Sequence, residues 1–184
     1  MGASGAEYLF AQHALKSGIK VEIVSFHDHI RIVPEGDVTI REINYDDLYS
    51  ITADIVRCAC ELGRFIYTSK YSKNILHCMW FTVIDADAVI IVGTLRKTSR
   101  GIHVEGDEGW AAQLFIQASI KRSANPPMLW LLDQDRKQWM RCMGQSDWRE
   151  TTAPKQLSKF GRIAVVGTRD VNYWAAFVIR NIVF

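Results

Sequence analysis

Apolar residues alternate along the chain between short β-branched runs and longer segments with helical spacing. Residues 19–26 alternate and are β-branched, which predicts a strand, and residues 37–43 predict a second, shorter one. Continuous apolar runs at 88–92, 128–132 and 163–166 are typical of strands that are buried on both faces. Helical spacing, ended by Gly18 and Gly63 in the first two cases, predicts helices over 5–16, 46–62, 74–86, 110–120 and 174–179.

This alternation of strands and helices predicts an α/β fold, a three-layer Rossmann-like parallel sheet with helices on both faces. The segment 138–143 is expected to return as a short antiparallel strand after a turn at 133–137. With 184 residues the chain is expected to form one domain, residues 1–184. Parallel sheets bind ligands at the carboxyl ends of their strands, so functional residues are expected there.

Composition and charge limit the classes of partner that are expected. The net charge of +2 gives no electrostatic reason to expect nucleic acid or membrane, and the longest apolar run, 87–93, is far shorter than the roughly 18 residues of a membrane span. The N-terminal residues lack the features of a secretory signal, which predicts a cytoplasmic protein.

The spacing of the four cysteines matches no metal-binding motif. Cys58 and Cys60 point about 200° apart on a helix, so free thiols and no metal or other cofactor are expected.

Small or glycine-rich residues lie at four places where a strand is expected to meet a helix. These segments are 2–6, 93–94, 106–109 and 167–169. Small side chains let backbone N–H groups approach an anion, and a helix N-terminus adds partial positive charge, so each segment is a candidate phosphate site. An ordinary tight turn explains any one of them alone. In a parallel sheet all four would gather at one edge.

The motifs Gly2-Ala-Ser-Gly-Ala-Glu7, Asp85-Ala-Asp-Ala-Val-Ile-Ile-Val-Gly93, Gly106-Asp-Glu-Gly109 and Val166-Gly-Thr-Arg-Asp170 together cover most of the chain. Their combination resembles the Rossmann-like SLOG superfamily, which includes LOG phosphoribohydrolases (the possible lysine decarboxylases), molybdenum-cofactor carriers and DprA-like proteins. The resemblance implies nucleotide binding at the glycine loops. The Val-Gly-Thr-Arg motif opens the fold in DprA-like members but stands here near the C-terminus, as if the order were permuted. No strand precedes Gly2, so such a strand is either missing or supplied from elsewhere.

The resemblance also bears on catalysis. Trp110 stands where LOG enzymes carry threonine, and Gln113 stands where they carry the acidic residue. Glutamine binds ribose hydroxyls but cannot take a proton, so this change preserves binding more readily than hydrolysis. Asp107 and Glu108 are candidate replacements for the catalytic acid, and helix capping explains them as well.

Several other residues are candidates for ligand contact. Arg169 is suited to bind phosphate bidentately, with a surface ion pair as the alternative. Trp110 either stacks on a base or packs in the core, Asn74 either contacts base or ribose or is an ordinary polar residue, and Ser4 either binds the anion or caps a helix. The candidate ligand-binding residues are Gly2, Ala3, Ser4, Gly5, Asn74, Gly93, Thr94, Gly106, Gly109, Trp110, Gln113, Gly167, Thr168 and Arg169.

Three functional hypotheses follow. The first is a sensor or carrier of a nucleotide or nucleotide-derived phosphate ligand, and the second is a nucleoside 5′-monophosphate phosphoribohydrolase that uses Glu108 or Asp107. The third is an oligomeric DprA-like nucleic-acid-binding protein, which the near-neutral charge disfavours. The apolar C-terminal segment 174–184 offers a surface for a homo-oligomer, or it packs on its own sheet.

Overall fold

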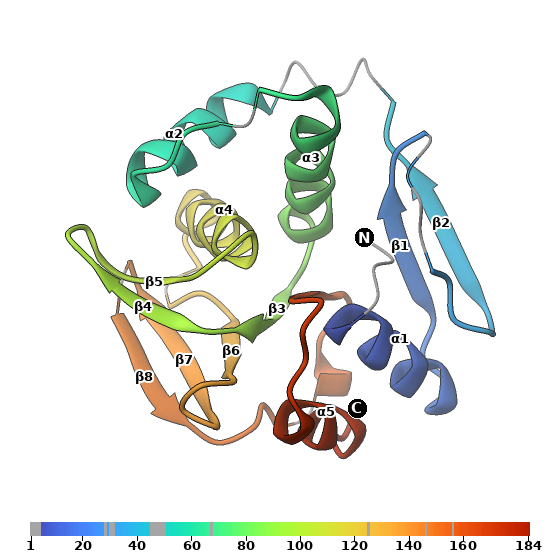
Figure 1. Cartoon of the computed structure of the whole chain (residues 1–184). Coiled ribbons are helices and arrows are strands. Elements are labelled where there is room, and N and C mark those ends of the chain that lie inside the picture. Colours follow the sequence, from blue (N-terminus) through green and yellow to red (C-terminus); the bar gives the residue numbers. More distant parts are fainter. Residues whose placement is uncertain are drawn as a thin grey trace.

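The structure is a computed structural model that describes residues 5–27, 29, 32–44, 51–66, 68–124, 126–145, 147–155 and 157–184. These residues form a mixed α/β fold (Figure 1). Gly2, Ala3 and Ser4 of the first glycine segment lie outside the described residues, and so do positions 46–50 of the predicted second helix.

The largest sheet is mixed, and its antiparallel part is larger than the single short strand that the sequence predicted beside a parallel sheet. Its strand order is β8-β7-β6-β3-β9. The strands are β3 (Ala88–Gly93), β6 (Leu129–Asp133), β7 (Gln138–Gly144), β8 (Asp147–Thr151) and β9 (Ile163–Gly167). β3 pairs in parallel with β6 and β9, whereas β7 and β8 form antiparallel pairs. The turn at 133–137 and the antiparallel return of β7 are confirmed. β8 was not expected from the sequence, and it extends the antiparallel half.

Two smaller sheets complete the described strands. β1 (Val21–Ser25) and β2 (Val38–Glu42) pair in parallel, and β4 (Leu95–Thr98) and β5 (Gly101–Val104) form an antiparallel hairpin. The hairpin corrects two expectations. Gly93-Thr94 leads from β3 into β4 and not into a helix, and the first part of the predicted loop 101–109 is strand β5. The loop before the next helix is therefore short.

The described helices are α1 (Ala6–Lys16), α2 (Thr52–Leu62), α3 (Lys70–Ile84), α4 (Glu108–Lys121) and α5 (Tyr173–Arg180). Gly18 and Gly63 have the positive φ angles of +75° and +64° that suit glycine after a helix end, as the sequence predicts. The side chain of Ser69 caps α3, and that of Asn172 caps α5, by accepting a backbone N–H.

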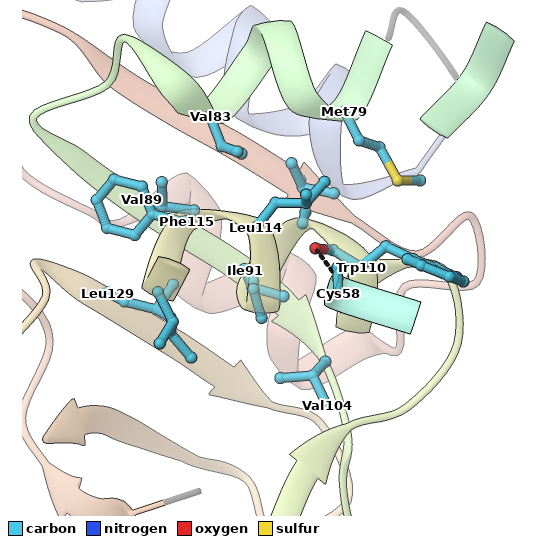
Figure 2. Packing of buried hydrophobic residues seen from close by; sticks show 14 of the residues in the cluster. Cys58, Met79, Val83, Val89, Ile91, Val104, Trp110, Leu114, Phe115 and Leu129 are labelled. Carbon is cyan, nitrogen blue, oxygen red and sulfur yellow. Dashed lines mark hydrogen bonds between the residues drawn. The ribbon is translucent and has the colours of Figure 1, made fainter. Parts of the chain in front are cut away.

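The core divides into two clusters on opposite faces of the central sheet. Val89 and Ile91 of β3 belong to the cluster with α2, α3 and α4, whereas Ile90 and Val92 belong to the cluster with α1 and α5. This alternation is what a strand produces when both of its faces are buried. In Figure 2, Val89, Ile91, Leu114 and Phe115 pack in the first cluster. Thus α4 is held between the sheet and two other helices.

The four cysteines are free thiols. Cys58 is buried and donates to the carbonyl oxygen of Trp110 at 3.8 Å, as drawn in Figure 2, whereas Cys60 is exposed. The predicted divergence of these two thiols is confirmed. Burial raises the pKa values of Cys58 and Cys78 to about 12, which keeps both thiols protonated. Within the described ranges, no helix combines the length and the apolar character needed to cross a membrane.

Candidate functional site

Two of the glycine segments come together from opposite ends of the chain. The backbone N–H of Ala6, in the first turn of α1, donates to the carbonyl oxygen of Thr168 at 3.1 Å. Gly5 has a φ angle of +100°, and a Cβ built there would lie 2.5 Å from that same oxygen. A Cβ at Gly167 would likewise lie 2.5 Å from the Cβ of Ala6. Both glycines are therefore required for the close approach of α1 to the end of β9.

The other two glycine segments meet beside β3. The N–H of Thr168 donates to the carbonyl oxygen of Val92, which places the β9 loop next to the end of β3. A Cβ at Gly93 would lie 3.8 Å from the Cβ of Glu108, and one at Gly106 would lie 2.7 Å from Oε2 of Glu108. The Glu108 carboxyl group therefore lies over Gly106, close to the carboxyl end of β3.

Arg64 fixes the loop that carries Glu108. Its guanidinium group donates to the carbonyl oxygens of Gly106 at 2.5 Å and Val104 at 3.1 Å. A Cβ at Gly109 would lie 2.9 Å from the same guanidinium group. Arg64 was not among the predicted site residues, because an arginine just after a helix end carries no local signal. Glycine is therefore needed at position 109 because a side chain there would collide with Arg64.

The local electrostatics are dominated by acids. Burial raises the pKa of Glu108, and the charges of Asp107 and Glu7 raise it further, whereas a hydrogen bond to its own backbone and the charge of Arg64 oppose the shift. Glu7 is 8% exposed and lies in the first turn of α1, as Glu108 does in α4. Glu7 ends the motif 2–7 but was not among the predicted site residues, because an acidic residue at a helix N-terminus is ordinary. The structure thus brings acidic groups from two helix starts to one edge.

The predicted anion cradles are partly occupied by the protein itself. The N–H of Ala6 bonds to Thr168, the N–H of Gly109 bonds to Gly106, and the N–H of Trp110 bonds to Asp107. These backbone donors are not free for a phosphate. An anion is further disfavoured at the start of α4 by the carboxyl groups of Asp107 and Glu108. The Arg64 guanidinium is engaged by the carbonyl oxygens of Gly106 and Val104, and further positive charge at this edge is offered by Arg169, which is exposed beyond Thr168.

The remaining predicted residues lie in different environments. Trp110 is 1% exposed within the main core cluster, so its position matches the packing alternative and not base stacking. Gln113 is 3% exposed inside α4, and its Nε2 has no hydrogen-bond partner. Asn74 is buried on α3. Thr94 is half-buried, and its carbonyl oxygen accepts from Glu105.

In the part of the chain that is described, no cluster of three or more His, Cys, Asp or Glu side chains is arranged to hold a metal ion. Comparison of the chain with protein-family models, curated proteins and solved structures finds no match in any of the three.

Proposed function

We propose that the edge formed by the ends of β3 and β9 binds a nucleotide or a nucleotide-derived ligand as a sensor or carrier. The observation that carries the proposal is the convergence of four glycines from distant parts of the chain: Gly5 and Gly167 meet beside the end of β3, and Gly93 and Gly106 lie against Glu108. Ligands of parallel sheets bind at this edge. Here β3, β6 and β9 form the parallel part of the sheet.

The charges suggest how such a ligand is oriented. Carboxylates accept hydrogen bonds from ribose hydroxyls and from base N–H groups, and they repel phosphate. The sugar or base therefore lies toward Glu7 and Glu108. The phosphate lies toward Thr168 and the guanidinium group of Arg169, which suits bidentate recognition. This arrangement replaces the expectation that the Gly106–Gly109 loop holds the phosphate.

The position of β9 supports the resemblance to a permuted SLOG-like Rossmann fold. β9 lies beside β3, and its loop contacts the first residues of α1. A strand followed by a glycine turn and a helix is the arrangement that the resemblance implies, and here it is assembled from the two ends of the chain.

Hydrolysis of an N-glycosidic bond is a second candidate function, because burial raises the pKa of Glu108. A carboxyl group that keeps its proton nearer neutral pH acts as a general acid. In this reaction water adds to the anomeric carbon, the bond to the base breaks, and Glu108 gives its proton to the departing base. A second carboxylate, Glu7 or Asp107, takes the proton of the water.

A thermal-shift screen tests the proposal with nucleoside mono-, di- and triphosphates, cyclic nucleotides and ADP-ribose. A ligand at one hundred times its Kd adds about 2.7 kcal/mol of stability. We expect stabilisation that Arg169→Ala weakens, whereas Arg180→Ala, an exposed arginine on α5, leaves it unchanged. Chromatography of the stabilising mixtures then separates the candidates. Intact ligand supports a sensor or carrier, and free base that disappears in Glu108→Gln supports hydrolysis. Absence of any shift across the panel overturns both.

The expected homo-oligomer stays a prediction. Tyr173, Phe177 and Val183 in and after α5 are 87%, 59% and 77% exposed. Ala175 and Ile179 of the same helix are fully buried in the second core cluster. The C-terminal segment therefore packs on its own sheet with one face and presents apolar groups on the other.

A further inference from the structure

A cavity of about 480 Å³ separates β1 from β9. Consecutive residues of both segments, 19–24 and 161–165, form its two long walls. Helix α1 contributes Phe10 and Ala14, α3 contributes Phe81, and the short helix η2 (Leu157–Lys159) contributes Leu157. In Figure 1 the β1-β2 pair stands apart from the central sheet, with α1 nearby.

Each long wall of the cavity is an unpaired strand edge. β1 pairs with β2 on one side and β9 pairs with β3 on one side, and no strand among the described residues pairs with the other edge of either. With few exceptions, the Cα atoms of β1 and β9 are more than 8 Å apart. Neighbouring strands lie about 4.8 Å apart, so one strand between two others needs a separation of about 9.6 Å. The gap is therefore too wide for β1 and β9 to pair directly.

The burial and the backbone groups around this gap determine which kind of ligand fits into it. Ile23, Val24 and Ala164 are each 5% exposed, so the carboxyl-terminal part of both edges is shielded from bulk water, whereas Lys20, Glu22 and Arg162 at the amino-terminal end are exposed. A buried backbone N–H or C=O group without a hydrogen-bond partner is costly. An apolar small molecule would fill the volume but would leave these groups unsatisfied. An extended peptide supplies both apolar side chains and a ladder of backbone donors and acceptors.

We propose that this cavity is a binding site for an extended, apolar peptide segment, which inserts as a strand between β1 and β9 and joins the β1-β2 pair to the central sheet. Because helices cover the gap on both faces, with Phe10 on α1 and Phe81 on α3, the inserted strand is apolar on both faces and carries no charge along its middle residues.

An ion pair crosses one end of the gap. Arg162 Nη2, just before β9, lies 2.5 Å from Oε1 of Glu22 in β1, and both side chains are partly exposed. These long side chains span the distance between the two walls at the amino-terminal end of both strands. The lining residues are exposed at this end, as at Ile19 and Lys20, and buried at the other, as at Val24 and Ala164. The peptide therefore enters past the ion pair, and removing the pair by Glu22→Gln raises the association rate.

The test uses the full chain and a fluorescein-labelled probe peptide, Lys-Lys-Gly-Val-Ile-Val-Val-Gly-Lys-Lys. Fluorescence anisotropy measures binding, and hydrogen exchange measures backbone protection. We expect saturable binding and at least tenfold slower exchange at alternate amides within 20–25 and 162–167. The same peptide with N-methyl groups on alternate residues of its core loses one ladder of hydrogen bonds, and its affinity falls at least tenfold.

Two variants locate the site. Ala11→Trp places an indole in the gap from α1 and is expected to reduce affinity at least tenfold. Ala53→Trp, at an exposed position of α2, serves as the matched control and leaves affinity unchanged. The proposal is overturned if the probe does not bind, if N-methylation has no effect, or if dodecanoate displaces the probe and protects no backbone amide. The last outcome assigns the cavity to apolar small molecules. None of these readouts involves a nucleotide, so the result is independent of the proposed function.

Discussion

The contact between α1 and the β9 loop is tested by adding one methyl group at Gly5. In Gly5→Ala the new Cβ meets the carbonyl oxygens of Thr168 and Arg169 at 2.5 and 2.6 Å, and the φ angle of +100° is unfavourable for alanine. Backbone strain of this kind costs about 1–3 kcal/mol, and overpacking costs about another 1–3 kcal/mol. We therefore expect a loss of about 2–6 kcal/mol in the free energy of unfolding.

Gly18→Ala separates the two costs. Gly18 follows the same helix with a φ angle of +75°, but a Cβ there has no atom within 4 Å. Only the conformational cost applies, about 1–2 kcal/mol. Urea denaturation monitored by circular dichroism gives both free energies by linear extrapolation. Gly5→Ala must lose more than Gly18→Ala. Equal losses would refute the close approach of the two chain ends, because the overlap with Thr168 and Arg169 would then be absent.

Three further predictions concern single side chains. Burial holds the pKa of Glu108 above its value in the unfolded chain, so ionisation of Glu108 destabilises the fold as the pH rises. In thermal melts, Glu108→Gln is therefore expected to be as stable as the wild type near pH 4 and more stable than the wild type at pH 7–8. Trp110→Ala removes a core side chain that is 1% exposed and should cost about 3–5 kcal/mol in urea denaturation; a loss below 1 kcal/mol contradicts its buried position. Asp133→Ala deprives the partly exposed Arg136 and two turn N–H groups of their acceptor and should lower the Tm. Asp147→Ala breaks an exposed ion pair and should change the Tm little. Equal Tm shifts would contradict the burial of Asp133.

The strongest hydrophobic signals in the sequence predict the centre of the fold correctly. The run Ala88-Val-Ile-Ile-Val92 is a strand buried on both faces, and α4 follows Gly106 as expected. The hairpin β4-β5 was missed because Leu95-Arg-Lys-Thr98 is mostly polar and exposed. β8 was missed for the same reason. Short exposed strands are stabilised by pairing with neighbours, which a local pattern does not reveal.

The candidate site was only partly predictable for a different reason. Gly5 and Gly167 were identified because glycine carries a local conformational signal, and the structure brings them together. Glu7 and Arg64 carry no such signal, since their roles depend on the approach of segments distant in sequence. Trp110 illustrates the reverse case. Its place beside a glycine loop favoured ligand contact as much as packing, and only the arrangement of α2, α4 and β5 decides for the core.

The central claim, that the carboxyl edge of β3 and β9 binds a nucleotide, is tested most directly by titrating ¹⁵N-labelled protein with AMP, ADP and ADP-ribose and mapping the amide shifts. We expect saturable shifts confined to residues 5–8, 93–94, 106–109 and 167–170. Shifts elsewhere, or no shifts with any of the three nucleotides, would contradict it.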